Sequence, residues 1–310
     1  MHLAAGQLEM NRRREPIAKV LARADTDATL RARLEYAAQA RDFAMTDLGL
    51  PDNGSYRSYA DLGRRYATWN LFAAPAFSVK PKRWCFPVAG CVTYRGYFDE
   101  DRAARAAERQ ERRGLDVHVG PSIAYSTLGH LQDPVLSTML GYGDAELAAF
   151  IIHELAHQAV YAPSDSDFNE AFATVVETEG LRRWLARVER TAELDAFLTA
   201  RGRQQAVAEK MIESRARLAT LYGSGAAEDE LHAGKAAELA RLSESLKADG
   251  FTVNGDLNNA RLAAVATYQR CVPALTAELA RLDNNLPAFY SAMKLLERDV
   301  PARIKFCPRA

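Results

Sequence analysis

The sequence predicts an α+β fold that is predominantly α-helical and contains a small β-sheet. Apolar residues recur at helical spacing over most of the 310 residues. Short β-prone segments separated by Gly and Pro occur between residues 66 and 126. Further along, two long helical patterns meet at Gly223-Ser224-Gly225 and therefore predict a helical hairpin.

These patterns divide the chain into three regions. Residues 1–65 are predicted to form an N-terminal helical region, which ends at the breakers that follow Leu48. Residues 66–180 are predicted to form a core that contains the small sheet. Residues 181–310 are predicted to form a C-terminal helical region whose hairpin completes a cleft.

The core is predicted to contain the order strand, strand, helix, strand. The β-prone segments are 77–79, 91–94 and 116–119. The alanine-rich and charged stretch 99–113 is typical of a surface helix, and Gly114 can end it.

Two more helices follow the sheet. Asp144 is predicted to cap a helix that runs to about Tyr161 and stops before Pro163. The polar residues 164–167 offer caps for the next helix. From Leu181 the chain is predicted to enter the first helix of the hairpin, and a last helical block follows the hairpin.

Charge and hydropathy exclude some partners. With 40 Lys and Arg against 40 Asp and Glu, no basic excess is present for binding nucleic acid in bulk. No apolar run reaches the roughly 18 residues of a transmembrane helix. Residues 1–8 lack the pattern of a secretion signal, which predicts either a cytoplasmic protein or one whose leader has been removed. Residues 151–200 carry nine acidic and four basic side chains, a net charge of −5 that suits a dication.

The most informative motif is His153-Glu154-Leu155-Ala156-His157, an HExxH pattern. Four residues are slightly more than one helical turn, so the two histidines project from the same face. Two imidazoles so placed can bind one Zn²⁺, and Glu154 beside them can take a proton from water. The uncharged neighbours are typical of a buried metal-binding helix, whereas the alternative is a surface helix with two idle histidines.

A catalytic zinc needs a third protein ligand and an open position. Val160 and Pro163 stand where the pattern HExxHxxGxxH requires Gly and His, so that subclass is excluded. Glu170 is the predicted third ligand, because one helical turn outward and one turn back return it to the level of the histidines. Glu177 shares the face of Glu170 and is predicted to support a ligand or to bind substrate, although ordinary surface charge is an alternative for Glu177 and Glu179.

These residues predict metal-assisted hydrolysis of a peptide bond. The metal would acidify its water and polarise the scissile carbonyl. Glu154 would then act as general base and deliver the proton to the leaving amine. An oxyanion must also be stabilised, and the candidates are Tyr268, Tyr125 and Tyr142. A core position is an equally good interpretation of Tyr268.

Several residues are candidates for binding a peptide substrate. The extended segment 123–126 contains Tyr125 and Ser126 and precedes the metal helix, where main-chain pairing can hold a peptide. Polar residues that open a later helix could contact substrate or cap that helix: Asn258, Asn259 and Arg261. An exopeptidase must also hold a free α-amine, for which the acidic candidates are Glu177, Glu179, Asp165 and Asp167.

Cys85 and Cys91 bracket a short Pro/Gly turn. A turn of this length can bring the two thiols within disulfide reach, and two separate buried thiols are the alternative.

The sequence resembles the bacterial zinc aminopeptidases of the gluzincin type. The resemblance covers most of the chain and rests on the HExxH motif with Asn169-Glu170 and on blocks at 69–75, 84–98, 125–129 with 133–136, and 257–262. It implies a zincin-like core in which His153, His157 and Glu170 bind one Zn²⁺ and Glu154 is the base. It also implies a periplasmic protein or an outer-membrane lipoprotein, held by an N-terminal lipid anchor ahead of this chain. An oxidising periplasm would allow a Cys85–Cys91 disulfide.

The predicted function is a zinc-dependent peptidase, with an aminopeptidase favoured and a peptide as the substrate. One alternative is a zinc endopeptidase. The other is a non-catalytic scaffold whose hairpin docks a partner and whose zinc site is a relic. Glu154 argues against the scaffold, because a structural zinc site needs no base. The sequence makes no prediction of the oligomeric state.

Overall fold

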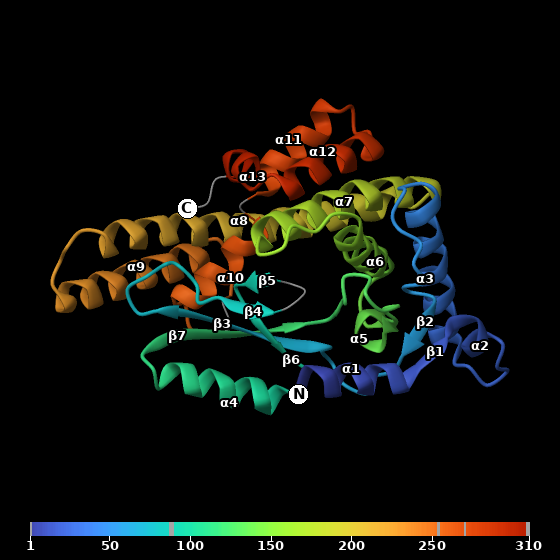
Figure 1. Cartoon of the computed structure of the whole chain (residues 1–310), viewed down its shortest axis with the longest axis horizontal. Helices are drawn as coiled ribbons and strands as arrows, with labels where there is room; N and C mark the ends of the chain where they lie inside the picture. Colours follow the sequence, from blue (N-terminus) through green and yellow to red (C-terminus); the bar gives the residue numbers. More distant parts are fainter. Residues whose placement is uncertain (1, 87–89, 253–254, 270, 308–310) are drawn as a thin grey trace.

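The computed structural model describes the chain except residues 1, 87–89, 253–254, 270 and 308–310, and it leaves the side chains of 2–5 and 267–269 undescribed. Helices dominate the described residues, so the predicted α+β, predominantly helical fold is confirmed (Figure 1). The helices are α1 (His2–Arg13), α2 (Ile17–Leu21), α3 (Ala28–Thr46), α4 (Glu100–Glu111), α5 (Ser137–Leu140), α6 (Asp144–Ala159), α7 (Ser166–Arg187), α8 (Thr191–Tyr222), α9 (Glu228–Ala248), α10 (Asn259–Gln269), α11 (Val272–Arg281), α12 (Leu286–Arg298) and α13 (Val300–Phe306). The strands are β1 (Arg14–Pro16), β2 (Ser58–Ala60), β3 (Thr68–Pro75), β4 (Trp84–Phe86), β5 (Gly90–Val92), β6 (Arg95–Tyr97), β7 (Leu115–Ser122) and β8 (Val135–Leu136).

The sheet that positions the site has the strand order β6-β3-β7 and is antiparallel throughout. Alternate residues of β3 face opposite sides, as the period of a strand requires. Trp69 and Leu71 pack against α4 on one side, whereas Phe72 and Ala74 pack against α10 on the other. The sheet therefore lies between α4 and α10 (Figure 1).

The expected strand at 77–79 is wrong. The chain leaves the sheet at Pro75 and turns, with the Ser78 amide donating to the Pro75 carbonyl at 3.2 Å. The side chain of Asn259 then donates to the carbonyls of Pro75 and Ala76, so this backbone binds α10 instead of another strand. The central strand, β3, lies just upstream. Both of its faces are buried, so its sequence lacks the alternation that marks a half-exposed strand.

Three other boundaries differ from expectation. Residues 93–94 lie outside β5, and the segment 123–126 is irregular. Helix α7 continues to Arg187, so Leu181 belongs to α7 and the hairpin begins later, at α8. The reason is that Leu181 is fully buried in the main core together with the rest of α7, which leaves no break at that position.

Helices α6 and α7 pack against each other at close range in the centre of the molecule (Figure 1). Gly180 of α7 makes this possible: a Cβ there would lie 2.7 Å from Leu48 Cδ1 and 3.0 Å from Ile152 Cγ2. A side chain at this position would have to displace the side chains of Leu48 and Ile152.

A single hydrophobic cluster draws residues from all three predicted regions, including Leu34 of α3, Ile151 of α6 and Phe289 of α12. The division at residues 65 and 180 stays a prediction. The hairpin α8–α9 shares a smaller cluster with α10, which contains Leu218, Leu242 and Leu262.

Two disulfides join described cysteines. Cys85 is bonded to Cys91 across the β4–β5 hairpin, and Cys271 is bonded to Cys307 around α11, α12 and α13. The second pairing was not foreseen, because its partners are 36 residues apart. Among the described residues, no helix has the length and apolar character needed to cross a membrane.

Candidate metal centre

Helix α6 presents both histidines of the HExxH motif to one side. Its opposite face carries the fully buried Leu147, Ile151 and Leu155, which fix the helix in the core. His153 and His157 are one turn apart, and their rings lie 4.8 Å apart between centroids. The apolar face thus sets the direction in which the two imidazoles point.

The loop between α6 and α7 returns Glu170 to the histidines. Asn169 clamps this loop with both ends of its side-chain amide. Its Oδ1 accepts from the Ala162 amide at 2.8 Å, and its Nδ2 donates to the Ala162 carbonyl at 2.9 Å. Asp165 caps α7 by accepting from the Phe168 amide and also accepts from Arg303 Nε of α13 at 2.9 Å. These contacts hold the first turn of α7 in the register that aims Glu170 inward.

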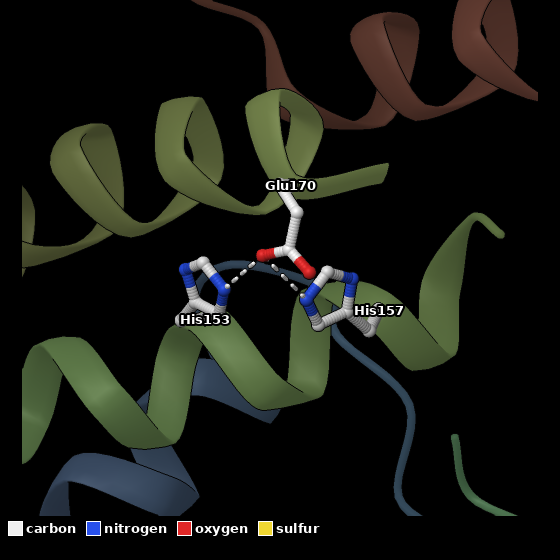
Figure 2. Close-up of side chains that lie close together, drawn as sticks. All are labelled: His153, His157 and Glu170. Atoms are coloured by element: carbon white, nitrogen blue, oxygen red, sulfur yellow. Dashed lines mark ion pairs between the residues drawn. The ribbon is translucent and has the colours of Figure 1, made fainter. Parts of the chain in front are cut away.

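His153, His157 and Glu170 form one cluster. Figure 2 shows Glu170 reaching from its helix toward the two rings on the facing helix. Glu170 Oε2 lies 3.4 Å from His153 Nε2 and 3.7 Å from His157 Nε2. One ligand atom from each residue lies within 4.8 Å of the others, so the three can hold a metal ion.

Glu177 and Arg201 support His153 from behind. Glu177 Oε2 lies 2.9 Å from His153 Nδ1, and its Oε1 is paired with Arg201 of α8. Because a carboxylate only accepts, this contact places a proton on Nδ1 and leaves the lone pair of Nε2 for the centre of the cluster. The Glu177 side chain is 4% exposed, so the interaction is shielded from solvent. Glu177 therefore lies where a residue supporting a ligand would lie.

Burial and charge set the protonation of the two glutamates. Burial raises the pKa of Glu154. His157 and His153 lower this pKa, whereas the negative charges of Glu170 and Asp133 raise it, and the net shift is upward. Burial alone would also raise the pKa of Glu170, but His157 and His153 together lower it to about 2. The cluster thus favours an ionised Glu170 and a more basic Glu154, as a ligand and a proton acceptor require.

The cluster opens into a cavity of about 790 Å³. Its walls come from the start of β3, the segment 92–96, the segment 122–131, and helices α6, α7 and α8. Tyr94 and Tyr161 both line it. Burial, followed by the charge of Glu170, raises the pKa of each tyrosine, so their hydroxyls stay protonated donors.

Tyr94 and Tyr161 were not among the oxyanion candidates. Their signal in the sequence is weak, since Tyr94 follows a strand and Tyr161 follows the end of the metal-binding helix. Of the earlier candidates, Tyr125 lines the cavity, whereas Tyr142 is 43% exposed and packs on Phe150. The side chain of Tyr268 lies outside the described residues.

The segment with Tyr125 and Ser126 is irregular but does line the cavity. Asp133, which is 1% exposed, shapes it. Its carboxylate accepts from Ser126 Oγ at 3.1 Å and from the amide and hydroxyl of Thr127 at 3.0 and 2.8 Å. The loop is thus fixed by a buried acid and not by sheet pairing.

Asn258, Asn259 and Arg261 do not belong to the described lining of the cavity. Asn258 donates to the Val117 carbonyl at 2.8 Å, and Asn259 bonds to the end of β3 and to Asp116. Arg261 donates to the Gly255 carbonyl at 3.3 Å. Asn258 and Asn259 therefore attach α10 to the sheet. The expected contact of these three residues with substrate stays a prediction.

The acidic candidates for an α-amine site are mostly engaged elsewhere. Glu179 forms ion pairs with Arg182 and Arg183, and Asp165 is bound to Arg303. Asp167 lies in the first turn of α7 outside the described lining. Of the four, Glu177 alone lines the cavity.

A predominantly helical α+β protein with a His-His-Glu cluster, a buried glutamate beside it and a large cavity defines a hydrolase-type site with a place for a metal ion. The chain belongs to the family described as "Putative aminopeptidase", which it matches over residues 1–305. The predicted aminopeptidase resemblance is confirmed, and its gluzincin detail stays a prediction. Comparison with curated proteins and comparison with solved structures gave no match.

Proposed function

We propose that this protein is a zinc-dependent aminopeptidase that removes residues from the N-terminus of peptides. The observation that carries the proposal is the convergence of His153, His157 and Glu170 next to the buried Glu154, in a chain that belongs to an aminopeptidase family. Two imidazole nitrogens and one carboxylate oxygen are a donor set that suits zinc and leaves a position open.

Each group in the site has a separate role in the proposed reaction. Zinc, when bound, supplies Lewis-acid polarisation of the scissile carbonyl and acidifies water. Glu154 takes the proton from the attacking water and passes it to the leaving amine, a role that its raised pKa favours. Glu177 and Arg201 orient His153.

We assign oxyanion stabilisation to Tyr94 or Tyr161, both of which line the cavity as protonated donors. Replacing the responsible tyrosine with Phe should lower kcat by about 10²- to 10³-fold with little change in KM. A rise in KM with kcat unchanged, for both Tyr94→Phe and Tyr161→Phe, would remove this role from both residues.

The deciding assay compares two peptides of equal sequence, one with a free amine and one N-acetylated, with purified protein and one equivalent of zinc. Cleavage of the free-amine peptide alone is expected. Equal cleavage of both would make the enzyme an endopeptidase. Zinc binding without cleavage of either would indicate the scaffold.

Matched variants separate chemistry from metal binding. Glu154→Gln should retain zinc and lose about 10³-fold or more of the activity, whereas Glu146→Gln on the first turn of the same helix should retain both. Glu170→Ala should lower the zinc content measured by atomic emission. Full zinc occupancy in Glu170→Ala would show that the third ligand is another residue.

We also propose that the protein works in an oxidising compartment such as the periplasm. Support comes from the two disulfides, since such bonds persist mainly outside the cytosol. Thiol titration of the denatured protein, isolated without reductant from its native host, should find no free thiol at Cys85, Cys91, Cys271 or Cys307.

A further inference from the structure

A second cavity, of about 400 Å³, lies between strand β6 and helix α4. It is lined by four arginines and one tyrosine: Arg95, Arg102, Arg105, Arg109 and Tyr97. Pairing in the sheet shows which side of β6 it occupies. Arg95 lies opposite Leu71 on the face covered by α4, whereas Gly96 lies opposite Asn70 on the face that lines the metal cavity. The two cavities thus lie on opposite faces of the same strand.

Helix periodicity brings the α4 arginines together. Arg102, Arg105 and Arg109 follow the i, i+3, i+7 spacing, so they share one side of the helix. The buried alanines of α4 pack on Trp69 and Tyr97, which places this arginine side next to the edge strand β6. Arg95 faces them from β6, and its guanidinium carbon lies 5.5 Å from the centre of the Tyr97 ring.

The positive charge of this cavity is poorly compensated. Arg105 has Asp99 at 3.9 Å. Within the part of the chain that the structure describes, no carboxylate forms an ion pair with Arg95, Arg102 or Arg109. The Nε of Arg95 is buried and has no hydrogen-bond partner there. A buried donor without a partner is costly to maintain, and an acceptor in the cavity would satisfy it.

We propose that this cavity is a binding site for a phosphoryl-bearing anion. Guanidinium forks match the oxygens of phosphate with paired hydrogen bonds. Four guanidinium groups favour a multivalent anion over a single carboxylate, because one negative charge would leave most of the repulsion among them in place. The cavity volume also accommodates two linked phosphoryl groups.

The test is isothermal titration calorimetry of the full chain with pyrophosphate. The wild-type protein should bind, and Arg102→Gln/Arg109→Gln should weaken binding by about tenfold or more. The matched control is Arg112→Gln/Arg113→Gln, which removes the same charge just beyond the C-terminal end of α4, outside the cavity lining. It should change the affinity by less than about twofold, because neither side chain lines the cavity or can bond to an anion within it.

Flotation with vesicles distinguishes a lipid headgroup from a soluble anion. Vesicles of phosphatidylcholine with or without phosphatidic acid are offered to the same three proteins. Pyrophosphate binding that depends on Arg102 and Arg109 identifies a soluble ligand, and phosphatidic-acid binding with that dependence, without pyrophosphate binding, identifies a headgroup. No binding in either arm overturns the site. Binding that persists in Arg102→Gln/Arg109→Gln also overturns the site, and such binding is expected if pyrophosphate contacts the metal ligands instead. An equal loss of binding in the control Arg112→Gln/Arg113→Gln overturns it as well.

Discussion

The helix pair α6–α7 and the hairpin α8–α9 both consist of consecutive helices joined by a short turn, yet they are held in different ways. Helix α7 buries 13 of its 22 residues, whereas α9 buries two of its 21, Leu242 and Leu246. Polar contacts also join α8 to α9 and its C-cap, such as Ser214 with Glu238 and Lys210 with Asp249. The metal ligands therefore stand on a tightly packed pair, and the hairpin can open locally at a smaller free-energy cost.

Core truncations should show the largest difference in stability between the two helix pairs. Phe172 of α7 is fully buried and stacks on Phe289, so Phe172→Ala should lower the global free energy of unfolding by about 3–5 kcal/mol. Leu218→Ala in α8 should cost about 2–3 kcal/mol. Its effect should appear in hydrogen exchange as faster opening of α8 and α9, with the metal content retained. Loss of metal from Leu218→Ala would show that the pairs unfold together.

The link between the pairs is Glu177, which binds His153 on one side and Arg201 of α8 on the other. Glu177→Gln should weaken metal affinity by about 10- to 100-fold, since it alters the contact that orients His153. Competition with a zinc chelator measures this. Glu179→Gln is the matched control, because Glu179 lies on the same helix but pairs with Arg182 and Arg183. An equal loss in both variants would indicate a general effect on α7.

The sheet beneath the hairpin should be sensitive to acid. Burial, and to a lesser degree Arg261, lowers the pKa of His118 from 6.5 to about 4 in the folded state. The neutral form is therefore favoured on folding, so this stabilisation is complete above pH 6.5 and is lost as the pH falls toward 4. Urea unfolding at pH 7 and pH 5 should show the loss, and His118→Gln should flatten it. An unchanged pH slope in His118→Gln would exclude this residue as the cause.

Surface ion pairs of the hairpin should matter least. Arg217 pairs with Glu238 at 3.1 Å and with Glu213 at 3.6 Å, and its side chain is 43% exposed. Arg217→Ala should lower the free energy of unfolding by less than about 1 kcal/mol. A loss comparable to that of Leu218→Ala would show that polar contacts hold the hairpin more than its apolar cluster does.

The features that the sequence predicted correctly are those that depend on residue spacing within one helix or turn. Four-residue spacing placed His153 and His157 on one face, and a return of one turn placed Glu170 beside them. The hairpin turn and the surface helix α4 follow from equally local signals. Local spacing specifies these features because each depends on a single helix or turn.

Features that depend on distant segments escaped prediction. Strand β3 is buried on both faces and lacks alternation, and the wall residue Tyr94 meets Glu170 only through the tertiary fold. The Asn258 and Asn259 side chains resemble substrate ligands in sequence but reach the sheet backbone instead. The arginine cavity joins a strand to a helix through sheet register, which no spacing within either segment reveals.

The Cys271–Cys307 bond turns the last part of the chain into a covalent ring that contains α11, α12 and α13. A single proteolytic cut between these cysteines leaves both pieces attached to each other. Such a nicked protein migrates as an intact chain until a reductant is added. The C-terminal helices can therefore tolerate a backbone break that would release a fragment elsewhere in the molecule.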